Sequence, residues 1–388
     1  MAIPISYNIR NLFVRKTATL MTAGGIALVV AILIMSLALA HGFRATLVMT
    51  GRDDNAIVIR TGASSEVQSG VARAAAHVIE LDEGVATMPG GTPLAVSEAV
   101  VLTNLTRRAN AAMSSNVVIR GVDERVLALR PEVRLVEGRF FRPGVDEVVV
   151  GRPLSERFNG CALGEAVRFG SRDWKVVGII ESGGSGFESE IWGDVESLLP
   201  AFDRDAFSSV TVRLASPAGF DVMKKRLESD PRLRVDVKRE SDYYQSQSAE
   251  LANVIRVLGL FLVIVMAAGA IFGALNTMYA AVGARTREIG TILALGFTPN
   301  SVMASFMIES VLLCLVGGVI GCFLSLPIHG MSTGTTNWAT FSEVAFKFRI
   351  TPGILVMGLV ASIALGLLGG YFPARSAARR KVTEALRD

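Results

Sequence analysis

The sequence predicts a membrane protein with four transmembrane α-helices and a large mixed α/β extracytoplasmic domain inserted between helices 1 and 2. Three observations carry this prediction. Four long stretches lack charged residues, one segment of about 200 residues between the first two stretches has an ordinary polar composition, and basic residues concentrate in the remaining short segments. Charged residues make up 19% of the chain, against about 25% in a typical soluble domain, and they are unevenly spread.

Four stretches without Asp, Glu, Lys or Arg are long enough to cross a bilayer. A hydrocarbon core of about 30 Å requires about 20 apolar residues in a helix. The uncharged stretches are 17–43, 257–284, 310–342 and 350–374. They are apolar all round, whereas helices of a soluble core are apolar on one face. We therefore predict transmembrane helices at 17–43, within 242–284, at 300–327 and at 350–374.

The distribution of charge predicts the orientation of these helices. Short cytoplasmic segments carry an excess of Lys and Arg. Segments 1–16, 285–299 and 375–388 together hold ten basic and three acidic residues, whereas residues 44–250 hold 26 basic and 30 acidic residues. We expect both termini to be cytoplasmic, with an amphipathic elbow at 1–16 and a basic tail at 375–388. A domain at 44–241 and a short loop at 328–349 would then be extracytoplasmic. Anionic lipids explain the basic segments without a nucleic acid partner.

The inserted segment predicts alternating strands and helices. Apolar and β-branched runs bounded by Gly and Pro indicate strands, and a helical apolar stripe indicates a helix over about 66–81. A β-α-β-like unit follows near the end of the segment. The expected strands are 56–60, 95–103, 116–119, 147–150, 166–169 and 174–180, and the expected unit comprises 209–214, 218–229 and 233–238.

The second apolar helix begins before the membrane. No proline interrupts residues 241–285, and Ser241 or Asp242 is a suitable N-cap. A helix over 242–284 would be about 64 Å long at 1.5 Å per residue, which exceeds the bilayer thickness. The excess predicts a stalk that joins the domain to the membrane.

Residue types typical of catalytic or metal sites are sparse. Cys161, Cys314 and Cys322 form neither a redox motif nor a metal-ligand spacing, and the three histidines are far apart. The glycine-rich segment 183–186 lacks the Lys and Ser/Thr of a phosphate-binding loop. No catalytic, cofactor or metal site is predicted, and we do not expect the chain to be an enzyme.

The segment 285–299 predicts a short helix on the cytoplasmic side. Gly296 can end the helix and Pro299 can open the next one. Apolar side chains fall at helical spacing, and the charged ones can face a partner. From charge alone, a coupling element and a plain re-entry loop remain equally open. The candidate residues are Arg285, Thr286, Arg287, Glu288, Ile289, Gly290, Ile292, Leu293, Leu295 and Gly296.

Glu309 is a carboxylate placed about two turns into the third helix. A charge in this position is costly and is usually paired. We expect an interfacial or intramembrane ion pair, with Arg285, Arg287 or a partner protein.

Four regions, one of them made up of three segments, resemble the MacB/FtsX-like permease superfamily, the type VII ABC systems that include lipoprotein-release subunits. Residues 11–43 resemble its first helix, and 282–299 (VGARTREIGTILALGFTP) resemble its cytoplasmic loop. Residues 117–123, 136–142 and 147–180 resemble its periplasmic core, and 371–387 (YFPARSAARRKVTEALR) resemble its C-terminal tail. No GxxxxGK[ST] sequence occurs in the chain, and about 16 residues precede the first helix, so the fused ATPase of MacB is not expected.

The resemblance implies a permease subunit in the bacterial inner membrane that works with a separate ABC ATPase dimer and a second permease chain, identical or paralogous. ATP and Mg would bind to the ATPase, and segment 285–299 would couple its closure to the domain. The cargo would be a lipid, a lipoprotein or a small hydrophobic compound exported or extracted from the inner membrane or periplasm, with a membrane-fusion protein as a further partner of export systems. Alternatives are an FtsX-like regulator of a periplasmic cell-wall hydrolase and a membrane-anchored receptor without an ATPase.

Overall fold

The computed structural model describes residues 16–337 and 340–380. The elbow expected at 1–16 and most of the basic tail lie outside the described residues. The chain divides into two compact units. The helical unit comprises the described residues within 1–41, 253–331 and 348–388, and the domain unit comprises 42–252 and 332–347.

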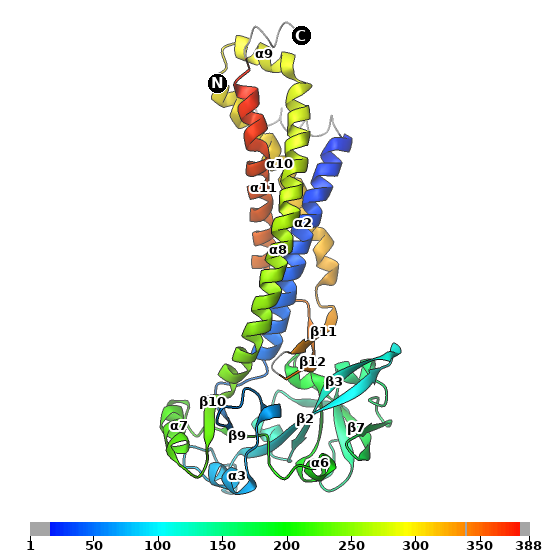
Figure 1. The fold of residues 1–388 in the computed structure, drawn as a ribbon, viewed down its shortest axis with the longest axis vertical. Helices are drawn as coiled ribbons and strands as arrows, with labels where there is room; N and C mark the ends of the chain where they lie inside the picture. Colours follow the sequence, from blue (N-terminus) through cyan, green and yellow to red (C-terminus); the bar gives the residue numbers. More distant parts are fainter. Residues whose placement is uncertain (1–15, 338–339, 381–388) are drawn as a thin grey trace. The chain divides into compact units, whose positions relative to one another are not determined.

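Four long helices run side by side (Figure 1). Each is long and apolar enough to cross a membrane. Proline at N1 and a threonine N-cap define two starts: Thr298 accepts a hydrogen bond from Ser301 N, and Thr351 accepts one from Ile354 N. The helices are α2 (Lys16–Val48), α8 (Glu240–Gly283), α10 (Pro299–Ser325) and α11 (Pro352–Ala378), with α9 (Thr286–Ala294) and the 3₁₀ turn η4 (Leu326–Ile328) between them.

Glycines allow α10 to pack closely against its neighbours. A Cβ at Gly317 would lie 2.7 Å from the carbonyl oxygen of Ala23, and a Cβ at Gly321 would lie 2.6 Å from that of Ala27, both on α2. On α11, Gly370 leaves no room for a Cβ beside Ser310 of α10. Small residues at these contacts serve packing within one chain, which is how apolar helices associate in a bilayer.

The domain unit contains a ten-stranded mixed sheet. Its order is β10-β1-β9-β2-β3-β8-β5-β7-β4, with β6 paired to β7. The strands are β1 (Asn55–Arg60), β2 (Ala95–Arg107), β3 (Asn110–Val122), β4 (Arg134–Gly138), β5 (Glu147–Gly151), β6 (Ala166–Phe169), β7 (Arg172–Glu181), β8 (Glu190–Asp194), β9 (Ser209–Arg213) and β10 (Val235–Arg239). The short helices are α3 (Arg73–Glu80), α4 (Val126–Leu129), α5 (Arg152–Arg157), α6 (Val195–Ala201) and α7 (Phe220–Ser229), and the 3₁₀ turns are η1 (Glu66–Gln68), η2 (Gly186–Ser189) and η3 (Pro217–Gly219).

The first four strands of the sheet form two interleaved split β-α-β units. Strand β9 is antiparallel to both β1 and β2, and β1 is antiparallel to both β9 and β10. The connections β1-α3-β2 and β9-α7-β10 therefore each join parallel strands that have one strand between them. This is the ferredoxin-like arrangement. The expected β-α-β unit is present, with β1 inserted between its two strands.

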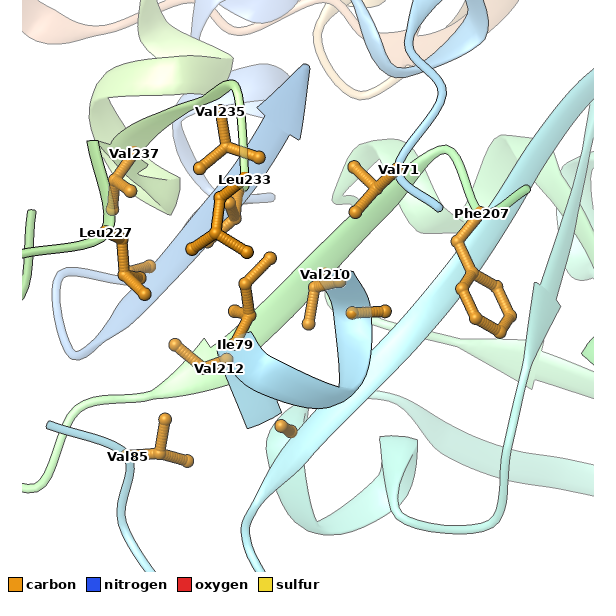
Figure 2. Packing of buried hydrophobic residues seen from close by; sticks show 14 of the residues in the cluster. Val71, Ile79, Val85, Phe207, Val210, Val212, Leu227, Leu233, Val235 and Val237 are labelled. Carbon is orange, nitrogen blue, oxygen red and sulfur yellow. The ribbon is translucent and has the colours of Figure 1, made fainter. Parts of the chain in front are cut away.

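An apolar core lies between α3, α7 and this half of the sheet (Figure 2). Ile79 of α3 and Leu227 of α7 pack against Val210 and Val212 of β9 and Val237 of β10. All five are at least 97% buried, so this core fixes the two helices on one face of the sheet.

The helix expected over 66–81 is shorter than predicted. Residues 66–68 form only a 3₁₀ turn, Val71 makes a β-bridge to Phe207, and α3 begins at Arg73. The long-range bridge and the buried position of Glu66 draw this segment away from the helix. The spacing of apolar residues within the segment could not reveal either interaction, because the partners are distant in the sequence.

Two hairpins differ from the expectations. The strands expected at 95–103 and 116–119 are parts of one long hairpin, β2–β3. Residues expected to form only a connecting loop form a second hairpin, β11 (Ser332–Asn337) and β12 (Ser342–Lys347). This second hairpin belongs to the domain unit although it lies between α10 and α11 in the sequence.

Candidate functional site

The segment that follows α8 contains α9 and a tight turn before α10. Gly296 has φ of +91°, and the hydrogen bonds Gly296 N to Leu293 O and Phe297 N to Ile292 O form a Schellman motif. Glycine fits this position because it alone adopts such a conformation without strain. The turn directs the chain from α9 into the cap of α10 at Thr298.

The apolar side of α9 packs within the helical unit. Ile289 is 2% exposed and Gly290 is buried. Ile292 and Leu293 pack against a cluster that includes Met278 of α8, Val302 and Phe306 of α10, and Ala374 of α11. The apolar side of α9 is therefore covered by other helices of the same chain. The surface that remains for a partner includes Arg287, Glu288 and Leu295, and the Leu295 side chain is 71% exposed.

Arg285 lies at the start of α9 and turns inward. Its guanidinium forms an ion pair with Glu309 of α10 at 3.0 Å and with Glu288 at 3.1 Å, and it lies 5.2 Å from the centre of the Phe306 ring. Glu309 is thus paired with one of the three partners expected for it. The side chains of both Arg285 and Glu309 are about nine-tenths buried, so this pair fixes the turn between α8 and α9 to α10. Thr286 donates to the carbonyl oxygen of Gly283, which closes the end of α8.

A second charged site lies inside the domain unit, where α8 begins. Arg120 of β3 forms ion pairs with three carboxylates: Glu66 at 2.8 Å, Glu190 of β8 at 2.6 Å, and Glu98 of β2. Arg130, which follows α4, lies 2.8 Å from Glu98. None of these five residues is more than 7% exposed.

Glu240, the first residue of α8, joins this network. Its carboxylate accepts hydrogen bonds from Arg130 Nη2 at 3.0 Å, Asn55 Nδ2 at 2.8 Å and Arg52 N at 3.2 Å. Glu240 is fully buried. We call the six residues Glu66, Glu98, Arg120, Arg130, Glu190 and Glu240 the buried charge network. Through Glu240, the network attaches the first turn of α8 to the sheet.

Aromatic side chains surround the buried charge network. Phe187 lies with its ring 5.5 Å from the Arg120 guanidinium and 4.4 Å from that of Arg130. The hydroxyl oxygen of Tyr243 of α8 accepts a hydrogen bond from the backbone N–H of Glu66 at 2.9 Å. Trp192 Nε1 donates to Glu190 at 2.8 Å. These contacts give the charged groups hydrogen-bond and cation–π partners in an apolar setting.

Four carboxylates face two guanidiniums in the network, which leaves an excess of two negative charges when all six are ionised. Burial by itself would raise the pKa of Glu98, but the charges of Arg130 and Arg120 outweigh it and hold the pKa of Glu98 below its ordinary value. Burial opposes the charge of Arg120, yet Glu190, Glu66 and Glu98 raise its pKa. These directions favour the charged forms of Glu98 and Arg120, whereas burial raises the pKa of Glu240 above its ordinary value.

The sequence predictions missed this network, although a signal for it exists. Glu98 and Arg120 each interrupt an apolar or β-branched run, AVSEAVV and VVIRGV. A charge inside such a run marks a buried charge that needs a partner. The partners could not be assigned, because they are 22 to 70 residues away along the chain.

No cluster of metal-ligating side chains occurs among residues 16–337 and 340–380. Cys161 is fully buried, and burial raises the pKa of its thiol to about 12. A thiol of this kind is unreactive near neutral pH.

The chain is similar to known proteins over nearly all its length. A family model for the MacB-like periplasmic core domain matches residues 19–230, and one for the FtsX-like permease C-terminal region matches residues 260–382. The macrolide export ATP-binding/permease protein MacB of Photorhabdus laumondii is 27% identical over 97% of this chain and 59% of its own length. MacB of Shigella boydii is 30% identical over 58% of this chain and 35% of its own length. The chain thus spans less than two thirds of these relatives.

Solved structures show a related comparison for the domain alone. The periplasmic region of MacB from Actinobacillus actinomycetemcomitans covers 51% of this chain and 93% of that structure, with 14% identity and a TM-score of 0.37. The extracellular domain of the transporter YknZ covers 47% of this chain and 98% of that structure, with 15% identity and a TM-score of 0.36. Because one family model covers more than half of the chain and a second covers most of the rest, the chain belongs to the ABC transporter permeases that combine a MacB-like periplasmic core domain with an FtsX-like permease region, and it is a multi-pass membrane protein.

Proposed function

We propose that this chain transmits ATP-driven motion from a separate cytoplasmic ATPase to its periplasmic domain, for the export or extraction of a lipid, a lipoprotein or a small hydrophobic compound. The observation that carries the proposal is the construction of α8. Its first residue, Glu240, is held in the buried charge network, and its last residue, Gly283, lies two positions before Arg285, which is held by Glu309. Both ends of one 44-residue helix are thus fixed by buried ion pairs.

The exposed side of α9 is the proposed contact for the ATPase. Arg287, Glu288 and Leu295 are exposed, whereas the opposite side of α9 is packed against α8, α10 and α11. A partner that pushes on α9 would act on the Arg285–Glu309 pair and so on the end of α8. ATP and Mg would be bound by the ATPase. In this arrangement, the chain lies in the inner membrane, with both termini and α9 in the cytoplasm.

A second permease chain is the proposed partner within the membrane. A groove of about 570 Å³ lies between α2 and α8 in the helical unit. Gly25, Gly269 and Gly273 line this groove, and no atom lies within 4 Å of a Cβ placed on any of them. The polar pair Thr22–Thr277, at 2.6 Å, lies beside them. Small residues with polar neighbours favour close packing of helices in a bilayer.

The ATPase contact can be tested with Leu295→Arg in the full-length chain, which is purified from its native host by an affinity tag. We expect at least a tenfold loss of the co-purifying ATPase, measured by quantitative mass spectrometry. Leu163→Arg, at a domain residue that is 45% exposed, is the matched control and should retain the ATPase. Equal recovery of the ATPase with both variants would contradict the proposed contact. The absence of an ATPase from the wild-type preparation would contradict the proposed function.

A further inference from the structure

The hairpin β11–β12 is a part of the permease region that folds onto the domain. It lies between α10 and α11 in the sequence, yet its residues belong to the domain unit. Val344, Ala345 and Phe346 of β12 are at least 93% buried. The hairpin is therefore a packed element of the domain and not an exposed connection.

Glu343 of β12 is the charged anchor of this hairpin. One carboxylate oxygen accepts a hydrogen bond from Arg107 of β2 at 2.5 Å, and the other accepts one from Arg157 of α5. The Glu343 side chain is 5% exposed, and those of Arg107 and Arg157 are 30% and 25% exposed. Two positive charges from separate elements thus hold one buried carboxylate. We call Glu343, Arg107 and Arg157 the hairpin clamp.

The neighbouring strand is shaped to admit the hairpin clamp. Gly334 of β11 lies opposite Ala345, beside the Thr336–Glu343 pair. A Cβ at Gly334 would lie 2.8 Å from both terminal nitrogens of Arg157 and closer still to the Glu343 carboxylate. Glycine is required here because the clamp occupies the space of a side chain.

Further contacts join the hairpin to the turn η2 and to strand β3. Ala345 N donates to Ser189 Oγ at 2.8 Å, and Asn116 Nδ2 of β3 donates to Phe341 O at 3.2 Å. The hairpin also reaches the domain ends of two long helices. Asn337 Nδ2 donates to Gln247 Oε1 of α8 at 3.3 Å, and the Phe346 ring lies edge-on to Phe43 of α2 at 5.7 Å.

The contacts leave no room for a ligand in this region. A cavity of about 40 Å³ lies among Glu343, Asn337, Gln247, Arg120 and Glu66. A cavity of this size holds about three water molecules at most. The small size of this cavity favours a structural role for the clamp.

Short, hydrogen-bonded segments join the hairpin to the membrane helices. Phe348 N donates to Met331 O at 3.0 Å, and Gly330 N donates to Phe348 O at 2.9 Å, so the pairing of the two strands continues beyond the hairpin. Ile350 N then donates to His329 Nδ1 at 3.1 Å, and α11 begins at Pro352. Hydrogen bonds therefore continue along the chain from the hairpin toward the starts of the segments that lead to α10 and α11.

We propose that Glu343 is the positioning residue through which α10 and α11 act on the periplasmic domain. Arg107 and Arg157 are its ion-pair partners in the domain. The proposal rests on the function proposed above and adds a second route to that of α2 and α8. Motion of the α10–α11 pair reaches β2 and α5 through the hairpin clamp.

The test uses the full-length chain in complex with its ATPase, with Glu343→Gln as the variant and Glu196→Gln as the matched control. Glu196 pairs with Arg73 on the domain surface, where both side chains are about half exposed. Hydrogen–deuterium exchange is measured with and without ATP and orthovanadate. In the wild type and the control, we expect nucleotide trapping to change exchange within residues 42–252. In Glu343→Gln, we expect exchange of residues 332–347 to be at least tenfold faster and the nucleotide-dependent change to fall at least fivefold.

A second variant separates transmission from simple folding. In a background where the native cysteines are replaced, Ser189→Cys and Ala345→Cys are combined with Glu343→Gln, so that a disulfide ties the hairpin to the domain. We expect the disulfide to restore the nucleotide-dependent change, and a reductant to remove it again. A full nucleotide response in Glu343→Gln despite faster hairpin exchange would overturn this proposal alone. No response in the wild type would overturn the proposed function and this proposal with it.

Discussion

Arg120 forms more ion pairs in the buried charge network than any one of its carboxylate partners. It pairs with Glu66, Glu98 and Glu190, and all four side chains are more than 90% buried. Loss of the guanidinium would leave these carboxylates with Arg130 as their only cation within the network. Loss of one carboxylate would reduce the excess of negative charge.

We therefore expect Arg120→Met to destabilise the domain by about 3–5 kcal/mol, the usual effect of removing one partner from a buried ion pair. Glu98→Gln should lower the unfolding free energy by only about 1 kcal/mol, because the amide oxygen still accepts a hydrogen bond. Denaturant titration followed by tryptophan fluorescence measures both effects. The signal reports on the domain, since Trp174 and Trp192 are buried in it and no tryptophan occurs in the four apolar helices. A larger loss for Glu98→Gln than for Arg120→Met would contradict this ranking.

The same carboxylate predicts a loss of stability in acid. The pKa of Glu98 is lower in the folded domain than its ordinary value of about 4.3. The resulting stabilisation is fully present above the unfolded pKa and is lost as the pH falls through the lower folded pKa. Thermal unfolding is measured from pH 6 to pH 3. The unfolding temperature should begin to decrease once the pH is below about 4.5. The slope of the unfolding free energy against pH should be shallower in Glu98→Gln than in the wild type. The difference corresponds to at most one proton, which is about 1.4 kcal/mol per pH unit. Identical slopes would show that Glu98 does not contribute.

For single residues, the sequence indicated that a buried charge needs a partner better than it indicated which residue that partner is. Glu309 was expected to need a cationic partner, and the structure pairs it with Arg285. Glu98 interrupts the apolar run of a predicted strand and Glu343 lies in a predicted loop, but neither residue could be given a partner from the sequence. Their partners come from other elements, and contacts of that range leave no trace in local periodicity.

Among the elements, the glycines of the apolar helices divide into two groups. Gly317, Gly321 and Gly370 lie where a Cβ would meet another helix of the same chain. Gly269 and Gly273 of α8 face open space along the groove. The sequence showed the glycines but could not assign them, because the partner of each helix face depends on the tertiary packing.

Gly321→Val should therefore destabilise the single chain by about 1–3 kcal/mol through overpacking against α2. Gly273→Val should leave the single-chain stability unchanged and weaken association with a second chain. Thermal unfolding in detergent and size-exclusion chromatography with light scattering measure the two effects. Loss of stability in Gly273→Val with normal association would reverse the assignment of this face.

The ends of strands and helices could be predicted where the apolar residues of a segment follow a single periodicity. The strand expected at 166–169 matches β6, and the helix expected at 218–229 lies close to α7, because alternation or a helical stripe is complete within each segment. Strands β4 and β8 were not predicted. β4 is a fully exposed edge strand with a bulge, and β8 contains both Glu190 and Asp194.

For the whole molecule, charge distribution predicts opposite sides of the membrane for the domain and for α9. Leu163 of the domain is 45% exposed and Leu295 after α9 is 71% exposed. In spheroplasts, Leu163→Cys should react with a membrane-impermeant maleimide, whereas Leu295→Cys should react only after permeabilisation. Native Cys161 should stay unlabelled, since it is fully buried and its thiol has a pKa of about 12. Reaction of Leu295→Cys in intact spheroplasts would contradict the proposed topology.

The plan of one helix, a domain and three helices could be derived from composition because hydrophobic length and charge act over whole segments. The assignment of residues 332–347 to the domain could not. It depends on ion pairs between Glu343 and residues 186 and 236 positions away, and on the fit of Gly334 against Arg157.

The interleaving of the two units affects how the soluble part can be produced. A recombinant fragment cut at residues 42 and 252 would omit the hairpin supplied by 332–347. It would expose the surface of β2 and α5 that the hairpin covers, and would leave Arg107 and Arg157 without their shared counter-ion. A recombinant domain with the native packing needs residues 332–347 attached through a designed linker. Ligands screened against the fragment without them would be exposed to a surface that is buried in the intact permease.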